Sequence, residues 1–155
     1  YDILSGLVGS EMCIRDRAFS PDGRTLYLSD SHPARQVVWA YDYDTDTGVP
    51  SNRRVFIPKL PAGRPDGAAV DADGGYWICG NEAGRIYRYT PDGRLDRSVD
   101  VPAPRVAMCA FGGPDLDVLF VTSIRPADAA PGSAAGAVFA LRPGARGLEE
   151  TASTG

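Results

Sequence analysis

One short phrase recurs three times along the chain, and it constrains the fold more than any other feature. Its copies start at Ala18, Ala69 and Ala110. Each copy is an apolar strand, a turn rich in Gly, Asp or Pro, and a second apolar strand. The copies start about 51 and then about 41 residues apart, a spacing typical of β-propeller blades. We therefore expect an all-β fold, a partial β-propeller of about three four-stranded blades. Because a closed ring needs more blades, we expect a piece of a longer protein.

Alternating apolar residues, many of them β-branched or aromatic, predict strands between and after these copies. The predicted ranges are 25–30, 36–44, 53–57, 67–71, 76–80, 85–89, 95–101, 108–111, 118–123 and 137–141. Residues 1–17 lack this alternation, and residues 7–17 resemble translated sequencing-adapter contamination. The predicted organisation is a foreign segment over 1–17, a three-blade unit over 18–143 and a flexible tail over 144–155.

Composition and charge narrow the class of partner and the compartment. The net charge is −4, which argues against nucleic acid, and no apolar run is long enough for a membrane helix. Cys13, Cys79 and Cys109 are odd in number and lack metal-type spacing, so we expect free thiols in a reducing, cytoplasmic environment. A single lysine among many arginines, with abundant Ala, Gly and Pro, suggests a GC-rich bacterial gene.

Three Pro-Asp-Gly triplets occur, and one of them is out of phase with the repeat. The triplets at 21–23 and 91–93 lie between strands, so Asp22 and Asp92 are predicted turn residues. The triplet at 65–67 precedes the first strand of its blade, and that strand lines the central channel of a propeller. We therefore expect Asp66 to face the channel mouth; the alternative is a carboxylate that caps a loop. The same offset in the other copies falls on Arg15 and Ala107.

Several blocks, in order, resemble the C-terminal half of the gluconolactonase / senescence marker protein (regucalcin) family. They are Ala18-Phe19-Ser20-Pro21-Asp22-Gly23, Tyr41-Asp42-Tyr43-Asp44, Ser51-Asn52-Arg53-Arg54, Pro65-Asp66-Gly67, Gly84-Arg85-Ile86-Tyr87 and Cys109-Ala110-Phe111-Gly112-Gly113, within about 18–125. The resemblance implies a six-bladed propeller that holds one divalent cation in its channel. Calcium is the expected ion, with zinc or magnesium as alternatives, and the implied activity is hydrolysis of sugar lactones.

The resemblance also implies a set of metal ligands, of which this chain matches one. The family uses a Glu near its start, an Asn in a Pro-Asn-Gly block and an Asp in Pro-Asp-Gly. Only the Asp is present, as Asp66; the Asn position falls on Arg15, and the Glu belongs to the half that is missing here. Asp66 would hold the metal and could accept a proton from water. Because calcium takes about six to eight oxygens, we expect the chain alone to be inactive.

Other candidates are weaker. An acidic run resembles the start of a calcium loop, but Thr47 and Arg53 occupy the positions that need Gly and Glu, so a solvated strand end and turn are predicted. That run is Asp42, Asp44 and Asp46. His32 is expected on a loop as a bystander or at the channel border, and Cys109 as a buried filler rather than a nucleophile. Trp39, Trp77 and the tyrosines are expected to pack between blades.

Three functions stay open at this point. The first is a metal-dependent lactone hydrolase acting on a small sugar lactone. The second is a non-catalytic propeller that binds calcium or a partner, because a fold does not imply a chemistry. The third is a propeller esterase with another ester substrate. In all three cases, unpartnered blade edges are expected to promote self-association.

Overall fold

The computed structural model describes residues 17–149, and all regular elements within them are β-strands. The first four are β1 (Arg17–Phe19), β2 (Thr25–Asp30), β3 (Val37–Tyr43) and β4 (Pro50–Ile57). The next four are β5 (Arg64–Val70), β6 (Tyr76–Asn81), β7 (Arg85–Tyr89) and β8 (Leu95–Asp100). The last three are β9 (Val106–Gly112), β10 (Val118–Ser123) and β11 (Val138–Leu141). Within residues 17–149, no helix is long and apolar enough to cross a bilayer.

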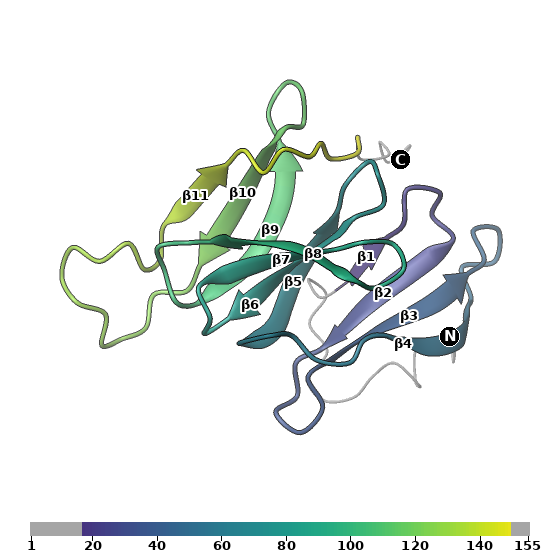
Figure 1. Cartoon of the computed structure of the whole chain (residues 1–155), viewed down its shortest axis with the longest axis horizontal. Helices are drawn as coiled ribbons and strands as arrows, with labels where there is room; N and C mark the ends of the chain where they lie inside the picture. The colour runs from purple at the N-terminus through teal and green to yellow at the C-terminus, as the bar shows by residue number, and fades with distance from the viewer. Residues whose placement is uncertain (1–16, 150–155) are drawn as a thin grey trace.

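The strands form three antiparallel sheets, each made from consecutive strands of the chain. The sheets are β1-β2-β3-β4, β5-β6-β7-β8 and β9-β10-β11. They lie beside one another with the second sheet in the middle (Figure 1). The prediction of an all-β, blade-like architecture is confirmed. The third sheet differs from the predicted four strands, because residues 17–149 supply three strands to it.

The two Pro-Asp-Gly turns predicted at 21–23 and 91–93 join strands at these positions. Gly23 and Gly93 end two Pro-Asp-Gly turns with φ angles of 69° and 81°, which favour glycine. Arg17 pairs with Leu28 in the first sheet, although the sequence assigned it to the foreign segment. The rest of that segment, with Cys13 and Arg15, lies outside the described residues, and the division into domains stays a prediction.

The first strands of the three sheets lie next to one another. β5 contacts β1 on one side and β9 on the other. This is the arrangement of the innermost strands of successive propeller blades. A residue near the start of β5 therefore lies at the inner edge of the second sheet.

Two of the three clusters of buried apolar side chains lie on opposite faces of the second sheet, and the third belongs to the first sheet. Along β6, Tyr76 and Ile78 pack toward the first sheet, whereas Trp77 and Cys79 pack toward the third. Successive strand residues point to opposite faces, so a strand covered on both sides is apolar throughout. Trp77 thus packs between blades, as predicted. Trp39 is only partly buried, and the Arg53 guanidinium lies 4.8 Å from the centre of its ring.

A buried ionic network lies at the end of the second sheet that carries the β5–β6 turn. Asp71 is fully buried and accepts hydrogen bonds from Trp77 Nε1 at 2.8 Å and from Arg88 Nε at 2.7 Å. It also accepts hydrogen bonds from the backbone N–H groups of Gly75 and Asp73. Arg88 is paired with Asp96 as well, and the hydrogen bond to Asp71 is the main reason that its pKa is raised. The network ties the β5–β6 turn to β7.

The first and third sheets expose apolar groups in the described part of the chain. Phe19 is 42% exposed on β1 and Val138 is 64% exposed on β11. β11 is also the outermost strand of its sheet. An open strand edge with an exposed apolar side chain is a template for pairing with another chain.

We therefore expect the purified chain to self-associate, and Val138→Lys to shift it toward the monomer. A lysine on an edge strand opposes pairing because its charge would have to be desolvated. Size-exclusion chromatography with light scattering would measure the mass. The control is Val49→Lys, a position that is 37% exposed but lies outside the strands. A compact wild-type monomer at all concentrations would contradict the prediction.

Candidate functional site

Asp66 lies within β5 rather than ahead of it, which corrects the sequence-based prediction. Pro65 pairs with Gly80, and the next paired residue, Ala68, faces Ile78. Asp66 and Gly67 together therefore face one residue of β6, which is a β-bulge. Bulges re-aim side chains and are frequent next to active sites. The out-of-phase Pro-Asp-Gly triplet is thus a bulge in an inner strand.

Gly67 allows the third sheet to approach this bulge closely. A Cβ atom on Gly67 would lie 2.7 Å from the carbonyl oxygen of Ala107 and would also overlap Met108. A side chain at this position would therefore displace β9. Ala107, which matches Asp66 in the repeat, meets Gly67 through its backbone and offers no ligating side chain.

Asp66 forms a hydrogen bond with a buried amide at the end of the neighbouring strand. Asn81 Nδ2 donates to Asp66 Oδ2 at 2.7 Å. Asn81 is 6% exposed, whereas Asp66 is half-buried. The amide therefore lies behind the carboxylate, on its protein side. The sequence-based alternative, a carboxylate that only caps a loop, does not fit a residue inside a strand.

Two polar atoms near this pair are buried without a hydrogen-bond partner among the described residues. They are Asn81 Oδ1 and Arg64 Nε. Arg64 and Asn81 face each other in the register of β5 and β6. The other end of the Arg64 guanidinium pairs with Glu82 at 3.1 Å. The inner edge of the second sheet thus carries a cluster of four polar side chains: Arg64, Asp66, Asn81 and Glu82.

The donor chemistry of this cluster suits one class of metal. Carboxylate and amide oxygens favour hard cations such as calcium or magnesium over soft metals. Residues 17–149 contain no group of three or more His, Cys, Asp or Glu side chains placed to hold an ion. Asp66 therefore fits the role of one oxygen ligand, and the described residues do not supply a complete set.

The other two Pro-Asp-Gly carboxylates have structural roles, as predicted. Asp22 accepts hydrogen bonds from Ser20 Oγ at 2.6 Å and from the Arg24 backbone N–H at 3.0 Å. The Ser20 hydrogen bond is the main reason that the pKa of Asp22 is lowered. Asp92 is held in the same way by Thr90, and its pKa is lowered too.

The acidic run near residue 44 is a solvated strand end and turn, as predicted. Asp44 accepts hydrogen bonds from the backbone N–H groups of Thr47 and Asp46, and these lower its pKa. Asp42 is exposed and accepts hydrogen bonds from Asn52 and Arg54, which lower its pKa. Both carboxylates are thus occupied by local partners.

His32 and Cys109 are also not placed for catalysis. His32 is half-buried in the loop after β2, where its Nδ1 accepts a hydrogen bond from the Ala34 N–H. Cys109 is buried on β9, and its thiol lies 3.9 Å from the carbonyl oxygens of Gly67 and Trp77. The adjacent Cys79 thiol has a raised pKa, first because of its hydrogen bond with Cys109 and then because of burial. Neither thiol has the exposed, electropositive surroundings of a nucleophile.

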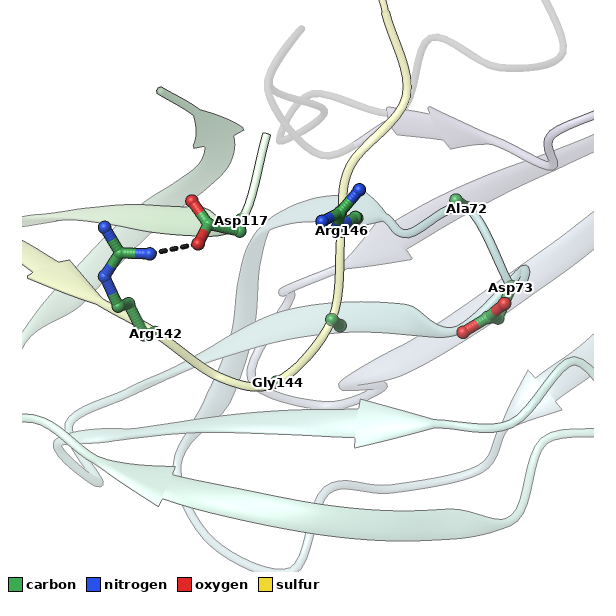
Figure 2. A pocket seen from close by; sticks show the side chains of 7 residues that line it. Ala72, Asp73, Asp117, Arg142, Gly144 and Arg146 are labelled. Carbon is green, nitrogen blue, oxygen red and sulfur yellow. Dashed lines mark hydrogen bonds and ion pairs between the residues drawn. The ribbon is translucent and has the colours of Figure 1, made fainter. Parts of the chain in front are cut away.

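A surface pocket of about 430 Å³ lies at the other end of β5, away from Asp66. Figure 2 shows Asp117 paired with Arg142 on one side, Asp73 on the other, and Arg146 between them. The segment after β11 forms one wall, held by a hydrogen bond from the Ala72 N–H to the Arg146 carbonyl at 2.8 Å. β5 runs from Arg64 to Val70, with Asp66 near its start and Asp73 in the turn beyond its end. The pocket and the Asp66 cluster therefore lie at opposite ends of this strand.

Sequence reasoning missed three members of the cluster around Asp66. Arg64, Asn81 and Glu82 come together because β5 and β6 pair in antiparallel register. The available signal was a polar Asn directly after the apolar run at 76–80. Nothing in the sequence links that Asn to an aspartate fifteen positions earlier.

A protein family described as SMP-30/Gluconolactonase/LRE-like region matches residues 16–125. That range covers more than half of the chain and contains Asp66 on its bulge. The chain belongs to this family. The resemblance on which the sequence-based prediction rested is thereby confirmed.

Individual relatives show the same relationship. The chain is 37% identical over 150 residues to a 6-deoxy-6-sulfogluconolactonase of Pseudomonas putida, covering 93% of this chain and 50% of that protein. It is 38% identical over 142 residues to the pentonolactonase XacC of Haloferax volcanii, covering 85% of this chain and 48% of that protein. A solved calcium-binding protein, regucalcin, from Agrobacterium tumefaciens superposes with a TM-score of 0.77 and 31% identity, covering 88% of this chain and 48% of that one. The chain spans about half the length of these relatives.

Proposed function

We propose that these blades belong to a metal-dependent hydrolase of sugar lactones, and that the chain of 155 residues alone has no turnover. The observation that carries the proposal is the position of Asp66. It is the acidic residue of the Pro-Asp-Gly triplet inside the range that the family matches, and it lies on a bulge at the inner edge of the second sheet. Lactonase activity in named relatives supports the substrate class.

The residues of the cluster would act as follows. Asp66 supplies one carboxylate oxygen to a divalent cation, with calcium as the expected ion and zinc or magnesium as alternatives. When bound, such a cation supplies Lewis acidity that polarises an ester carbonyl. We further propose that the carboxylate of Asp66 accepts a proton from the attacking water. Asn81 holds one oxygen of Asp66 from behind, and Glu82 holds the nearby Arg64 guanidinium.

A chimera tests this function in a complete ring. Residues 18–149 would replace the matching segment of the Pseudomonas putida lactonase, to which the chain is 37% identical. We expect the chimera to hydrolyse a sugar lactone, to lose at least about 90% of its rate in chelator, and to recover on addition of calcium. The isolated chain is the control and is expected to show no turnover above buffer. A folded chimera with no turnover, or with turnover unaffected by chelator, would contradict the proposal.

A second candidate is a propeller that binds calcium without catalysis. It is favoured by a structural relative that is named a calcium-binding protein. The chimera separates the two candidates. Calcium binding measured by calorimetry without lactone hydrolysis would favour the second candidate over the first.

A further inference from the structure

The buried amide of Asn81 is the least expected group in the cluster. The five residues that precede it on β6, Tyr76 to Gly80, are apolar or small and buried. Asn81 continues this strand, is 6% exposed, and leaves Oδ1 buried without a partner among the described residues. A buried acceptor without a hydrogen bond costs about 1–3 kcal/mol.

Because the unpaired acceptor lowers stability, a contribution to stability does not explain why an amide stands at position 81. A leucine has nearly the same size and would bury no unpaired acceptor at this position. Replacing the partners of a buried polar pair by apolar groups of the same shape can be nearly neutral or stabilising. Local rules of stability are typically violated at functional positions. We therefore infer that the role of the amide lies in its Nδ2 atom, which donates a hydrogen bond to Asp66.

The hydrogen bond selects one oxygen of the carboxylate. Asn81 Nδ2 engages Asp66 Oδ2 at 2.7 Å, and no described residue hydrogen-bonds Asp66 Oδ1. The amide must present Nδ2 here, because Oδ1 of Asn81 would repel an ionised carboxylate. Asp66 is half-buried, and its Oδ1 is the oxygen that the Asn81 hydrogen bond leaves for a ligand.

The neighbouring ion pair removes a competitor for the same carboxylate. Arg64 is two residues from Asp66 and could pair with it in place of a cation. Glu82 Oε1 instead lies 3.1 Å from the terminal nitrogen of Arg64. Both neighbours of Asp66 in the cluster therefore leave its Oδ1 without a competing partner.

We propose that Asn81 is a positioning residue that holds Asp66 so that it offers a single oxygen, Oδ1, to a divalent cation. This inference rests on the proposed function, in which Asp66 is a metal ligand. Asn81 itself does not touch the ion. Outer partners of metal ligands typically affect metal affinity by 10–100-fold, because they fix the orientation of the ligand.

The test is the affinity of the chimera described above for Mn²⁺, a hard divalent ion whose free form is measured by electron paramagnetic resonance. The variants are Asp66→Asn, Asn81→Leu and the double variant, each made in the chimera. We expect Asn81→Leu to weaken the Asp66-dependent binding about tenfold or more. It should have no further effect when Asp66 is already Asn, because the two residues act as one unit. The matched control is Ser29→Ala, a buried polar residue of the first sheet that bonds the hydroxyl of Tyr76.

Each outcome separates this inference from the proposed function. If Asp66→Asn weakens binding and Asn81→Leu does not, Asp66 remains a ligand and the positioning role is overturned. If Asp66→Asn changes nothing, the metal role of Asp66 fails and the inference fails with it. If Asn81→Leu does not fold by circular dichroism, Asn81→Ser replaces it, because a serine hydroxyl is too short to reach Asp66. A loss of affinity in Ser29→Ala equal to that in Asn81→Leu would also overturn the positioning role.

Discussion

Asp71→Asn is expected to destabilise the chain by about 3–5 kcal/mol, the cost of removing one partner from a buried ion pair. The carboxylate is fully buried and accepts hydrogen bonds from Trp77 Nε1, Arg88 Nε and the Gly75 N–H. An asparagine of the same size keeps one oxygen but turns an NH₂ group toward these donors. It also leaves the Arg88 guanidinium, whose side chain is 10% exposed, with Asp96 as its remaining carboxylate partner.

Urea unfolding at a fixed protein concentration would measure this loss as a lower midpoint. The matched control is Asp100→Asn, which removes the ion pair with Arg85, a pair of 2.6 Å whose side chains are 48% and 78% exposed. Exposed pairs contribute about 0–1 kcal/mol, so the control should shift the midpoint little. Equal shifts for the two variants would show that the Asp71 network contributes no more than a surface ion pair.

Asp66→Asn is expected to reduce kcat/KM of the chimera for a sugar lactone by at least about 100-fold. Loss of an outer partner of a metal ligand typically costs 10–100-fold, and loss of the ligand itself should cost more. The substitution keeps the size of the side chain and removes its charge. Because Asp66 is half-buried and has one hydrogen bond, the free energy of unfolding should change by less than about 1 kcal/mol.

The control for this prediction is Asp42→Asn. Asp42 is an exposed carboxylate that accepts a hydrogen bond from an asparagine amide at 2.8 Å, much as Asp66 does at 2.7 Å. It lies on β3, away from the inner strands. Its replacement should leave kcat/KM within about twofold. Full activity in Asp66→Asn would remove Asp66 from the catalytic machinery.

Much of the fold could be predicted from local sequence because its strands are short and regular. Alternation placed β2, β7 and β10 at their observed bounds, and the Pro-Asp-Gly turns at 21–23 and 91–93 were identified by residue type. The strand at 76–80 is apolar throughout, which agrees with its burial between two sheets. These features depend on near neighbours in the chain, so the local pattern carries them.

The candidate site was predictable only in part. The out-of-phase triplet singled out Asp66, but the turn expected there is a bulge inside β5, because β6 pairs on both sides of it. The third sheet has three strands rather than four in the described part of the chain. No local sequence pattern marked Asp71 as a buried ionic residue, because its partners Trp77 and Arg88 lie on two other strands.

The sequence by itself determined the all-β repeat, the turns and the carboxylate that stands out from them. Only the tertiary structure placed Asn81 behind that carboxylate and Arg64 against Glu82, and only it buried Asp71 between Trp77 and Arg88. The physical reason is the separation along the chain between the residues that interact. Turns and alternation arise from the geometry of adjacent residues, whereas strand register and sheet packing bring together side chains that no local pattern connects.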